Sequence, residues 1–179
     1  MDTIAKEGSG DTIANAIERL ESAVDRRRGF GVGTSRSVTL WTDGLRCSTE
    51  EGRWCLDSDL PGAFGGSGSA PTPGVLLRAS LGSCMAMSYL LRAAKHGIEL
   101  TSLRVTVEAD SEIAGMLSCD ATAPPGYTEI RCHVEIESPA TPDEVTRVID
   151  EGDRLSPLLD AVGSANTIRR TISIRSSGT

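Results

Sequence analysis

The chain has 179 residues, 39% of them hydrophobic and 24% charged, and carries a net charge of −7 at pH 7, as expected for one globular domain with a core. This acidic charge, without a basic patch, excludes the class of proteins that bind phosphate backbones, so no nucleic acid is expected as a partner. The N-terminus lacks a secretory signal, and the longest charge-free apolar stretch, residues 79–91, is shorter than the ~20 residues that cross a bilayer, so we expect a cytoplasmic protein without a membrane partner.

An amphipathic helix is predicted over residues 11–28. Apolar residues recur there every three or four positions, at Ile13, Ile17, Leu20 and Val24, which gives the helix one apolar face. Gly29 follows three arginines, as is typical of a helix end. We interpret residues 1–35 as a helical arm and linker, and residues 36–179 as the main domain.

Three short strands are predicted after the linker, over residues 37–42, 45–50 and 53–56. Apolar and polar residues alternate there with a period of two, and Asp43-Gly44 is a strong signal for a hairpin turn. Residues 57–72 are rich in Gly, Ser and Pro, which predicts a loop with too little apolar content to pack by itself.

A long helix over residues 73–96 is the most clearly delimited element. Thr72 is a good N-cap, Pro73 suits the first helical position, and Gly97 follows the last turn. Apolar residues from Val75 to Leu91 occur all around this helix, a pattern typical of a helix buried on every side. Because complete wrapping of such a helix demands more apolar surface than a short chain offers, we expect a second subunit to help cover it.

The remainder of the chain predicts an antiparallel sheet and two further helices. The strands have one apolar and one polar face, and Pro124-Pro125-Gly126 is expected to turn between two of them. Residues 141–144 form a capping box, which starts a helix that runs to about Arg154. Strands over residues 103–107, 116–121, 130–136 and 167–174, with a short helix after Ser156-Pro157, complete an α+β order.

Cys84, inside the long helix, is the residue on which we expect any chemistry to centre. Without a secretory signal, the five cysteines are interpreted as reduced thiols. A buried free cysteine is more often a small core residue, whereas a reactive thiol needs a cation or a helix N-terminus that favours the thiolate. The sequence leaves both interpretations open.

The other four cysteines fall on predicted strands. Cys119 and Cys132 are equally far from the predicted turn between them, so a simple hairpin places them opposite each other. They would then form either a reduced core pair or a disulfide, or one would be a resolving thiol beneath the long helix. Cys47 and Cys55 are symmetric about Glu51, but whether they share a face is ambiguous.

The residues predict no metal site, cofactor site or hydrolytic triad. There is no Cys-x-x-Cys pair, and His96 and His133 are isolated and interpreted as surface residues. The glycine-rich stretch 65–68 lacks the lysine of a phosphate-binding loop. We therefore expect neither a metal nor a cofactor.

The stretch from residue 57 to residue 87 resembles the OsmC family, which comprises osmotically inducible protein C and the organic hydroperoxide resistance proteins. It has a Gly-Gly loop, a Pro-x-x-Leu-Leu helix start and the sequence Ala-Ser-Leu-Gly-Ser-Cys-Met-Ala-Met around Cys84. His96-Gly97-Ile98, the strand that starts near Leu103 and Ser156-Pro-Leu-Leu-Asp160 follow in matching order. The resemblance covers about residues 36–176 and leaves the N-terminal helix unexplained.

This resemblance implies an intertwined homodimer in which antiparallel sheets wrap around two long central helices. It also implies thiol-dependent reduction of hydroperoxides at the dimer interface. Cys84 would attack the peroxide, a second cysteine in a Cys-Pro motif would close a disulfide, and an external thiol would reduce it. An arginine and a glutamate would activate the first thiol.

Three of these four catalytic positions differ in this chain. Ser156 stands where the second cysteine is expected, the helix start has no glutamate, and residues 64–70 contain no arginine. An oxidised Cys84 would therefore need another thiol, either from Cys55, Cys119 or Cys132 or from a small molecule. The possible replacement cations are Arg53, Arg78 and Arg154.

Two functional hypotheses follow. The first is thiol-dependent reduction of a small hydrophobic peroxide through Cys84, with an external thiol as the reductant, and it requires a cation close to the sulfur. The second is a family member without peroxidase activity, which binds a small hydrophobic ligand or a protein partner in the interface cleft.

Overall fold

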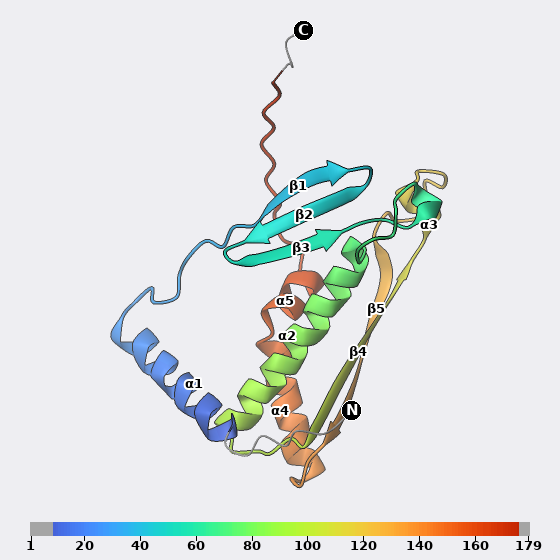
Figure 1. Ribbon diagram of the computed structural model, residues 1–179. Coiled ribbons are helices and arrows are strands. Elements are labelled where there is room, and N and C mark those ends of the chain that lie inside the picture. The colour runs from blue at the N-terminus through green and yellow to red at the C-terminus, as the bar shows by residue number, and fades with distance from the viewer. Residues whose placement is uncertain (1–8, 176–179) are drawn as a thin grey trace.

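The structure of the protein is a computed structural model that describes residues 9–175 (Figure 1). It combines helices with antiparallel strands, which confirms the α+β class expected from the sequence. In chain order, the elements are α1 (Ser9–Arg26), β1 (Val38–Asp43), β2 (Arg46–Glu51), β3 (Trp54–Ser58), the 3-10 helix η1 (Gly62–Phe64), α2 (Pro73–Lys95), β4 (Ser102–Ser111), α3 (Ile113–Met116), β5 (Tyr127–Glu137), α4 (Pro142–Arg154) and α5 (Pro157–Gly163).

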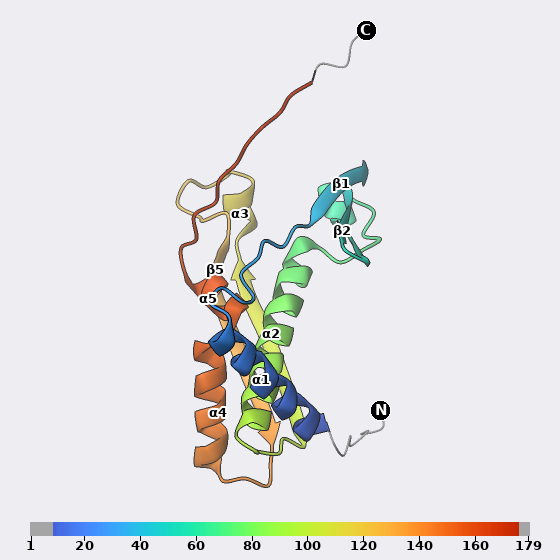
Figure 2. The ribbon, with the colours of Figure 1, turned by 90° about the vertical axis from the view of Figure 1, so that its left-hand side faces the viewer.

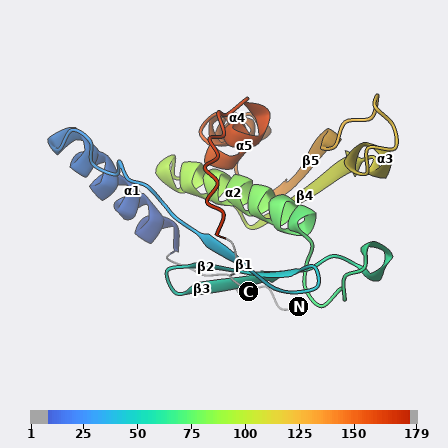
Figure 3. The same ribbon diagram turned by 90° about the horizontal axis from the view of Figure 1, so that it is seen from above.

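The strands form two separate antiparallel sheets. One has the order β1-β2-β3, and the other is the long hairpin of β4 and β5. The predicted turn after Asp43 is confirmed, because Gly44 has a φ of 52°, in the left-handed region that glycine adopts readily. Helices α4 and α5 lie on the side of α2 that faces away from the β1–β3 sheet (Figures 2 and 3).

Helix α2 supplies the centre of the hydrophobic core. It starts as the sequence predicts, because the Oγ1 of the N-cap residue Thr72 accepts a hydrogen bond from the backbone N of Val75 at 3.3 Å. Its core cluster consists of three almost completely buried side chains, Leu81, Met85 and Tyr89. They pack against half-buried residues of β4, β5, α4 and α5, namely Leu103, Val105, Val107, Ile130, Val134, Ile149, Leu158 and Leu159.

The opposite face of α2 is apolar but exposed. Met87 and Leu90 are 61% and 41% exposed, so one chain alone does not bury this helix on every side, and the expected cover by a second subunit stays a prediction. The pattern is typical of a helix whose second apolar face contacts another molecule, because large apolar side chains in such a row leave unfavourable surface in water.

By length and composition alone, α2 could also cross a membrane, and it is the one such helix within residues 9–175. The core helix of a soluble protein has the same length and apolar content. Here the helix packs with one face on the β4–β5 hairpin and on α4, so the core explains the apolar residues of that face.

Helix α4 packs closely on α2 through a glycine. Its predicted capping box is confirmed, with Thr141 and Glu144 hydrogen-bonded in both directions. A Cβ atom on the buried Gly152 would lie only 2.5 Å from Cδ1 of Tyr89. The Tyr89 hydroxyl donates a hydrogen bond to Oδ1 of Asp153 at 2.5 Å, and burial raises the pKa of Tyr89. Helix α4 is therefore held in one position against α2.

Helix α1, which the sequence predicts as an arm, packs beside the C-terminal half of α2 (Figure 2). Ile17 is buried, and Glu21 forms an ion pair with Lys95 at the end of α2. Leu20 and Val24 on the same amphipathic helix are 56% and 54% exposed. Only part of the apolar face of α1 is therefore used within the single chain.

Two predicted strands are not formed. Residues 116–121 leave the short α3 through a turn in which Ser118 has a φ of 56°, and the backbone N of Cys119 donates a hydrogen bond to the oxygen of Ala114. Residues 167–174 pair with no strand of the described chain, and Ile168 and Ile174 are about nine-tenths exposed. Alternation of apolar and polar residues predicts an extended chain, but a strand also requires a hydrogen-bonding partner.

Candidate functional site

Cys84 lies where α2 meets the start of α5. Its Sγ is 3.5 Å from Oγ of Ser156, although the two residues are 72 positions apart in the sequence. Cys84 is half-buried, between the core face of α2, which carries Met85, and the exposed face, which carries Met87. The thiol is therefore within reach of a small molecule and also of the protein interior.

Ser156 is buried, with 1% of its surface exposed. As the N-cap of α5, its Oγ accepts a hydrogen bond from the backbone N of Leu159 at 3.4 Å, and Pro157 occupies the first helical turn. The Ser-Pro sequence, at which the resemblance implies a second cysteine, is thus placed beside Cys84. It provides an alcohol there instead of a thiol.

The predicted facing pair of Cys119 and Cys132 is wrong. Cys132 in β5 is paired with Val107 of β4, whereas Cys119 follows α3 outside any strand. The prediction failed because β5 pairs directly with β4, and the segment that carries Cys119 is part of their connection. Burial raises the pKa of Cys132, and so does the nearby charge of Asp153.

Cys47 and Cys55 do not face each other either. The β2–β3 hairpin turns between Glu51 and Trp54, so its centre lies later in the chain than the predicted Glu51. Cys47 is consequently paired with Ser58, and the Sγ of Cys55 lies 3.3 Å from Oγ of Ser48. All five cysteines are free thiols.

None of the three candidate arginines is hydrogen-bonded to Cys84 in the described part of the chain. Nη1 of Arg78 donates to the hydroxyl of Tyr127 at 3.3 Å. Arg53 stacks over the ring of Trp54, with 4.7 Å from Cζ to the ring centre, and Arg154 is exposed in the last turn of α4. The polar partner that the structure provides for the Cys84 sulfur is the Ser156 hydroxyl.

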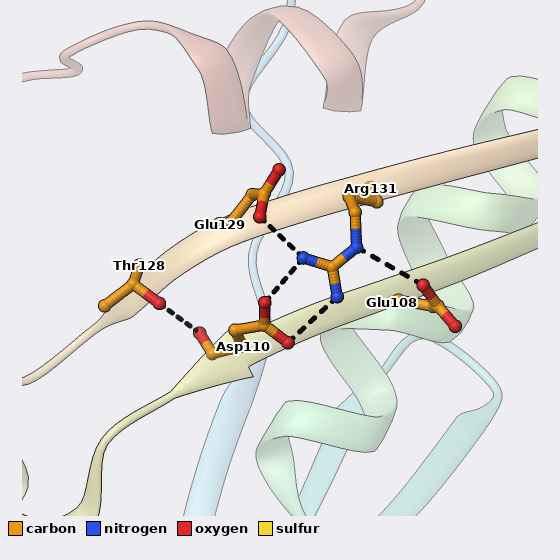
Figure 4. A network of polar contacts seen from close by, with 5 residues as sticks. All are labelled: Glu108, Asp110, Thr128, Glu129 and Arg131. Carbon is orange, nitrogen blue, oxygen red and sulfur yellow. Dashed lines mark hydrogen bonds and ion pairs between the residues drawn. The ribbon is translucent and has the colours of Figure 1, made fainter.

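A further arginine, Arg131, is held by carboxylates on the β4–β5 hairpin (Figure 4). Nη1 of Arg131 lies 2.5 Å from Oδ2 of Asp110 and 2.7 Å from Oε2 of Glu129, and its Nε lies 3.3 Å from Oε2 of Glu108. All four side chains are exposed, so water and salt weaken these ion pairs. We interpret this cluster as support for the pairing of the two strands.

Asp59 is a buried carboxylate that sequence reasoning missed. It is 2% exposed, and its Oδ2 accepts hydrogen bonds from the backbone N and the hydroxyl of both Ser67 and Ser69. Gly66 is required beside it, because a Cβ there would lie 1.9 Å from the carbonyl oxygen of Leu60. The loop between β3 and α2 is therefore ordered around one carboxylate. In the sequence, the feature that could have predicted this role is an Asp that precedes a segment rich in Gly and Ser.

The loop around Asp59 is expected to open at acidic pH. Hydrogen bonds from Ser67 and Ser69 hold the pKa of Asp59 well below its ordinary value. This contribution is complete above the unfolded-state pKa of about 3.9 and is lost as the pH falls towards the folded-state value. Limited proteolysis within residues 59–69 should therefore accelerate below about pH 4 in the native protein.

The Asp59→Asn variant provides the test of this expectation. Because an amide oxygen is a weaker acceptor than a carboxylate, cleavage in the variant should be roughly tenfold faster already at pH 7 and should depend little on pH. Asp43→Asn, at an exposed position, is the matched control and should behave like the native protein. Equal cleavage of all three proteins at every pH would contradict the assignment.

His96 and His133 lie at the surface, as predicted, but His96 is not isolated. Its Nε2 is 2.6 Å from Oε2 of Glu151, which joins the end of α2 to α4. This contact lowers the pKa of Glu151. Over residues 9–175, no group of three or more His, Cys, Asp or Glu side chains is arranged to hold a metal ion.

A shallow groove of about 330 Å³ runs along α2 beside β4. Its walls are mainly small or apolar, and the guanidinium of Arg78 is its one charged group. Cys84 does not line it, so the groove and the thiol are separate features of α2. The lining residues are Val75, Arg78, Ala79, Gly82, Ser83, Val105 and Val107.

In the comparison with family models, residues 66–171 match the family described as OsmC-like protein. This range is more than half of the chain and includes both Cys84 and Ser156. Comparison with the curated proteins gives no match.

Solved structures share the fold. An OsmC-like protein from Mycoplasma pneumoniae is 17% identical, with a TM-score of 0.62 over 73% of this chain and 88% of that one. An organic hydroperoxide resistance protein OsmC from Legionella pneumophila is 20% identical, with a TM-score of 0.56 over 74% and 90% of the chains. An organic hydroperoxide resistance protein from Elizabethkingia anophelis is 18% identical, with a TM-score of 0.54 over 73% and 89%. At these identities, the likeness shows the fold alone.

Proposed function

The chain belongs to the OsmC-like protein family, and from this premise we propose that it reduces organic hydroperoxides with the thiol of Cys84. The observation that carries the proposal is the 3.5 Å contact between Sγ of Cys84 and Oγ of Ser156. This contact joins the two segments that the resemblance associates with the chemistry. Two of the solved relatives, from Legionella pneumophila and Elizabethkingia anophelis, are named as organic hydroperoxide resistance proteins, which supports the choice of substrate class.

The surroundings of Cys84 suit a small hydrophobic peroxide. Met87 and Leu91 lie on the same side of α2 and are 61% and 39% exposed, so they offer apolar surface to an alkyl group. The thiol itself is half-buried, which limits access to small molecules. A peroxide bound here would have its O–O bond near the sulfur and its alkyl part on the exposed side of the helix.

A homodimer is part of the proposal. The exposed apolar face of α2, with Met87 and Leu90, would be covered by a second copy of the chain. The β1–β3 sheet supports the same arrangement, because Trp41 and Trp54 are 73% and 63% exposed in the single chain. Burying these side chains would contribute to association through the hydrophobic effect.

The test is the rate at which Cys84 is oxidised by an organic hydroperoxide at neutral pH. Intact-protein mass spectrometry would follow the product with tert-butyl hydroperoxide as substrate. We expect oxidation at least about tenfold faster than that of a small free thiol, which corresponds to only about 1.4 kcal/mol of transition-state stabilisation. The Cys84→Ser variant should lose this fast phase entirely.

The matched control is Cys55→Ser, which removes a more exposed thiol and leaves Cys84 in place. It should keep the fast phase. Oxidation of the native protein no faster than that of the free thiol, or a fast phase that persists in Cys84→Ser, would contradict the peroxidase proposal.

Binding of a small apolar ligand is the second candidate function. It is favoured by the groove along α2 and by Arg78, whose guanidinium donates a hydrogen bond to the neutral hydroxyl of Tyr127. An apolar anion such as 1-anilinonaphthalene-8-sulfonate is a suitable probe. Binding that is lost in Arg78→Gln, together with slow oxidation of Cys84, would make ligand binding the better account of this protein.

A further inference from the structure

The Ser156 hydroxyl is in a position to donate a hydrogen bond to the Cys84 sulfur. Its oxygen already accepts a hydrogen bond from the backbone N of Leu159. Its own proton also needs an acceptor, and because Ser156 is 1% exposed, bulk water does not provide one. The Sγ of Cys84, at 3.5 Å, is within reach of this proton. Such a donor stabilises the charged thiolate more than the neutral thiol.

No other thiol of the chain lies on this side of α2. Cys132 is paired with Val107 of β4, and Cγ2 of Val107 would lie 3.2 Å from a Cβ built at Gly82 of α2. Gly82 precedes Cys84 by two residues, which is roughly 160° around the helix, so the strand pair that carries Cys132 lies on a different side of α2. Cys47 and Cys55 lie in the β1–β3 sheet, and Cys119 lies beyond α3, so they belong to other parts of the fold.

We propose that Ser156 is the positioning residue of a single-thiol site. Its hydroxyl donates a hydrogen bond to the Cys84 thiolate, and the oxidised sulfur is reduced by a small-molecule thiol instead of a second cysteine of the chain. This inference rests on the proposed function, because it names the second substrate of the same site.

The reaction balances with two molecules of external thiol. The Cys84 thiolate attacks one peroxide oxygen, so that an S–O bond forms, the O–O bond breaks and the alkoxide takes up a proton to leave as an alcohol. A first external thiol attacks the resulting sulfenic acid, which forms a mixed disulfide and releases water. A second external thiol attacks the external sulfur of that disulfide, which releases a symmetrical disulfide and restores the Cys84 thiol.

The hydrogen bond is tested by alkylation, which needs no peroxide. The rate at which iodoacetamide modifies Cys84 would be measured against pH in the native protein, Ser156→Ala and Ser156→Thr. We expect Ser156→Ala to shift the pH–rate profile to higher pH and to lower the rate at pH 7 about tenfold, because the thiolate loses its donor. Ser156→Thr keeps a hydroxyl and should stay within about threefold of the native rate.

Because Ser156 also caps α5, thermal unfolding of each variant would be measured in parallel. Loss of the cap alone would lower stability without moving the pH–rate profile, since the profile reports the ionisation of the thiol. A Ser156→Ala profile identical to that of the native protein would overturn the positioning role, whatever its effect on stability.

The external reductant is tested by the products. With tert-butyl hydroperoxide alone, the native protein should gain one oxygen atom on Cys84, trapped with dimedone, and should form no disulfide. Added 2-mercaptoethanol should convert this product to a mixed disulfide and then to the free thiol. The Ser156→Cys variant should instead close a disulfide between positions 84 and 156, because the two side chains are already in contact.

These outcomes separate the inference from the proposed function. Fast oxidation that ends in a disulfide with another cysteine, within one chain or between two, would overturn the single-thiol site and leave the peroxidase function standing. Slow oxidation of Cys84 combined with a shifted alkylation profile in Ser156→Ala would contradict the peroxidase function and support the role of Ser156.

Discussion

Replacing Leu81 by alanine is expected to lower the free energy of unfolding by about 3 to 4 kcal/mol. Leu81 is 1% exposed and lies with Met85 and Tyr89 at the centre of the core cluster. The substitution removes buried methyl groups and leaves a cavity between α2 and the β4–β5 hairpin, which these well-packed neighbours can fill only in part. Urea unfolding followed by circular dichroism would measure the change.

Leu90 on the same helix is the matched control. It is 41% exposed, so Leu90→Ala should cost less than about 1 kcal/mol at protein concentrations where the chain is monomeric. At higher concentrations, the cost should grow if a second copy covers this face, because the variant would then also weaken association. Equal losses for Leu81→Ala and Leu90→Ala in the monomer would contradict the assignment of the core face.

Replacing Gly152 by alanine is expected to lower the free energy of unfolding by about 2 kcal/mol. The added Cβ would lie 2.5 Å from Cδ1 and 3.0 Å from Cε1 of Tyr89, and 3.4 Å from its backbone N. Tyr89 is fully buried and hydrogen-bonded to Asp153, so its ring has little freedom to move aside. The cost of this strain should exceed the ~1 kcal/mol by which alanine normally stabilises a helix interior relative to glycine.

Gly163, at the end of α5, provides the control for this substitution. Within residues 9–175, and apart from its chain neighbours and the backbone of its own helix, no atom lies within 4 Å of a Cβ built at this position. Gly163→Ala should therefore change stability by less than about 1 kcal/mol. Thermal unfolding of the two variants would be compared under identical conditions. A Gly152→Ala variant as stable as Gly163→Ala would mean that α4 can shift on α2 without cost.

The Gly152→Ala variant also has an expected effect on the candidate site. Helix α4 ends at Arg154, and only Leu155 separates it from Ser156, the N-cap of α5. A displacement of α4 away from Tyr89 would therefore move the Ser156 hydroxyl relative to the Cys84 sulfur. Alkylation of Cys84 should report this displacement in the folded variant, even where stability is restored by added salt or osmolyte.

Local signals in the sequence predicted most of the helices correctly. Thr72 and Pro73 start α2, and Thr141 and Glu144 start α4, as their capping chemistry requires. The strands β1 to β3 were predicted to within a few residues, because a turn such as Asp43-Gly44 is specified by the residues that form it. These features depend on interactions between neighbours in the chain.

Long-range pairings were predicted less well. Symmetry about a turn placed Cys119 opposite Cys132, but β5 pairs directly with β4 and leaves Cys119 in the connection. In residues 167–174, apolar and polar residues alternate as in a strand, yet this segment pairs with none of the described strands. In both cases, the local pattern was compatible with a strand, and the missing information was which segment lies next to it.

The sequence by itself determined the α+β class and the position and caps of the central helix, because periodicity and capping are encoded by nearby residues. The role of Cys84 as the focus of any chemistry stays a prediction from the order of the motifs. Only the tertiary structure decided that the Ser156 hydroxyl meets the Cys84 sulfur, that Asp59 orders its loop from a buried position, and that the other cysteines lie apart from Cys84. These contacts arise from the packing of α2 against α4, α5 and the strands. Such packing depends on the shapes of segments that are distant in the chain, and a local sequence pattern does not contain that information.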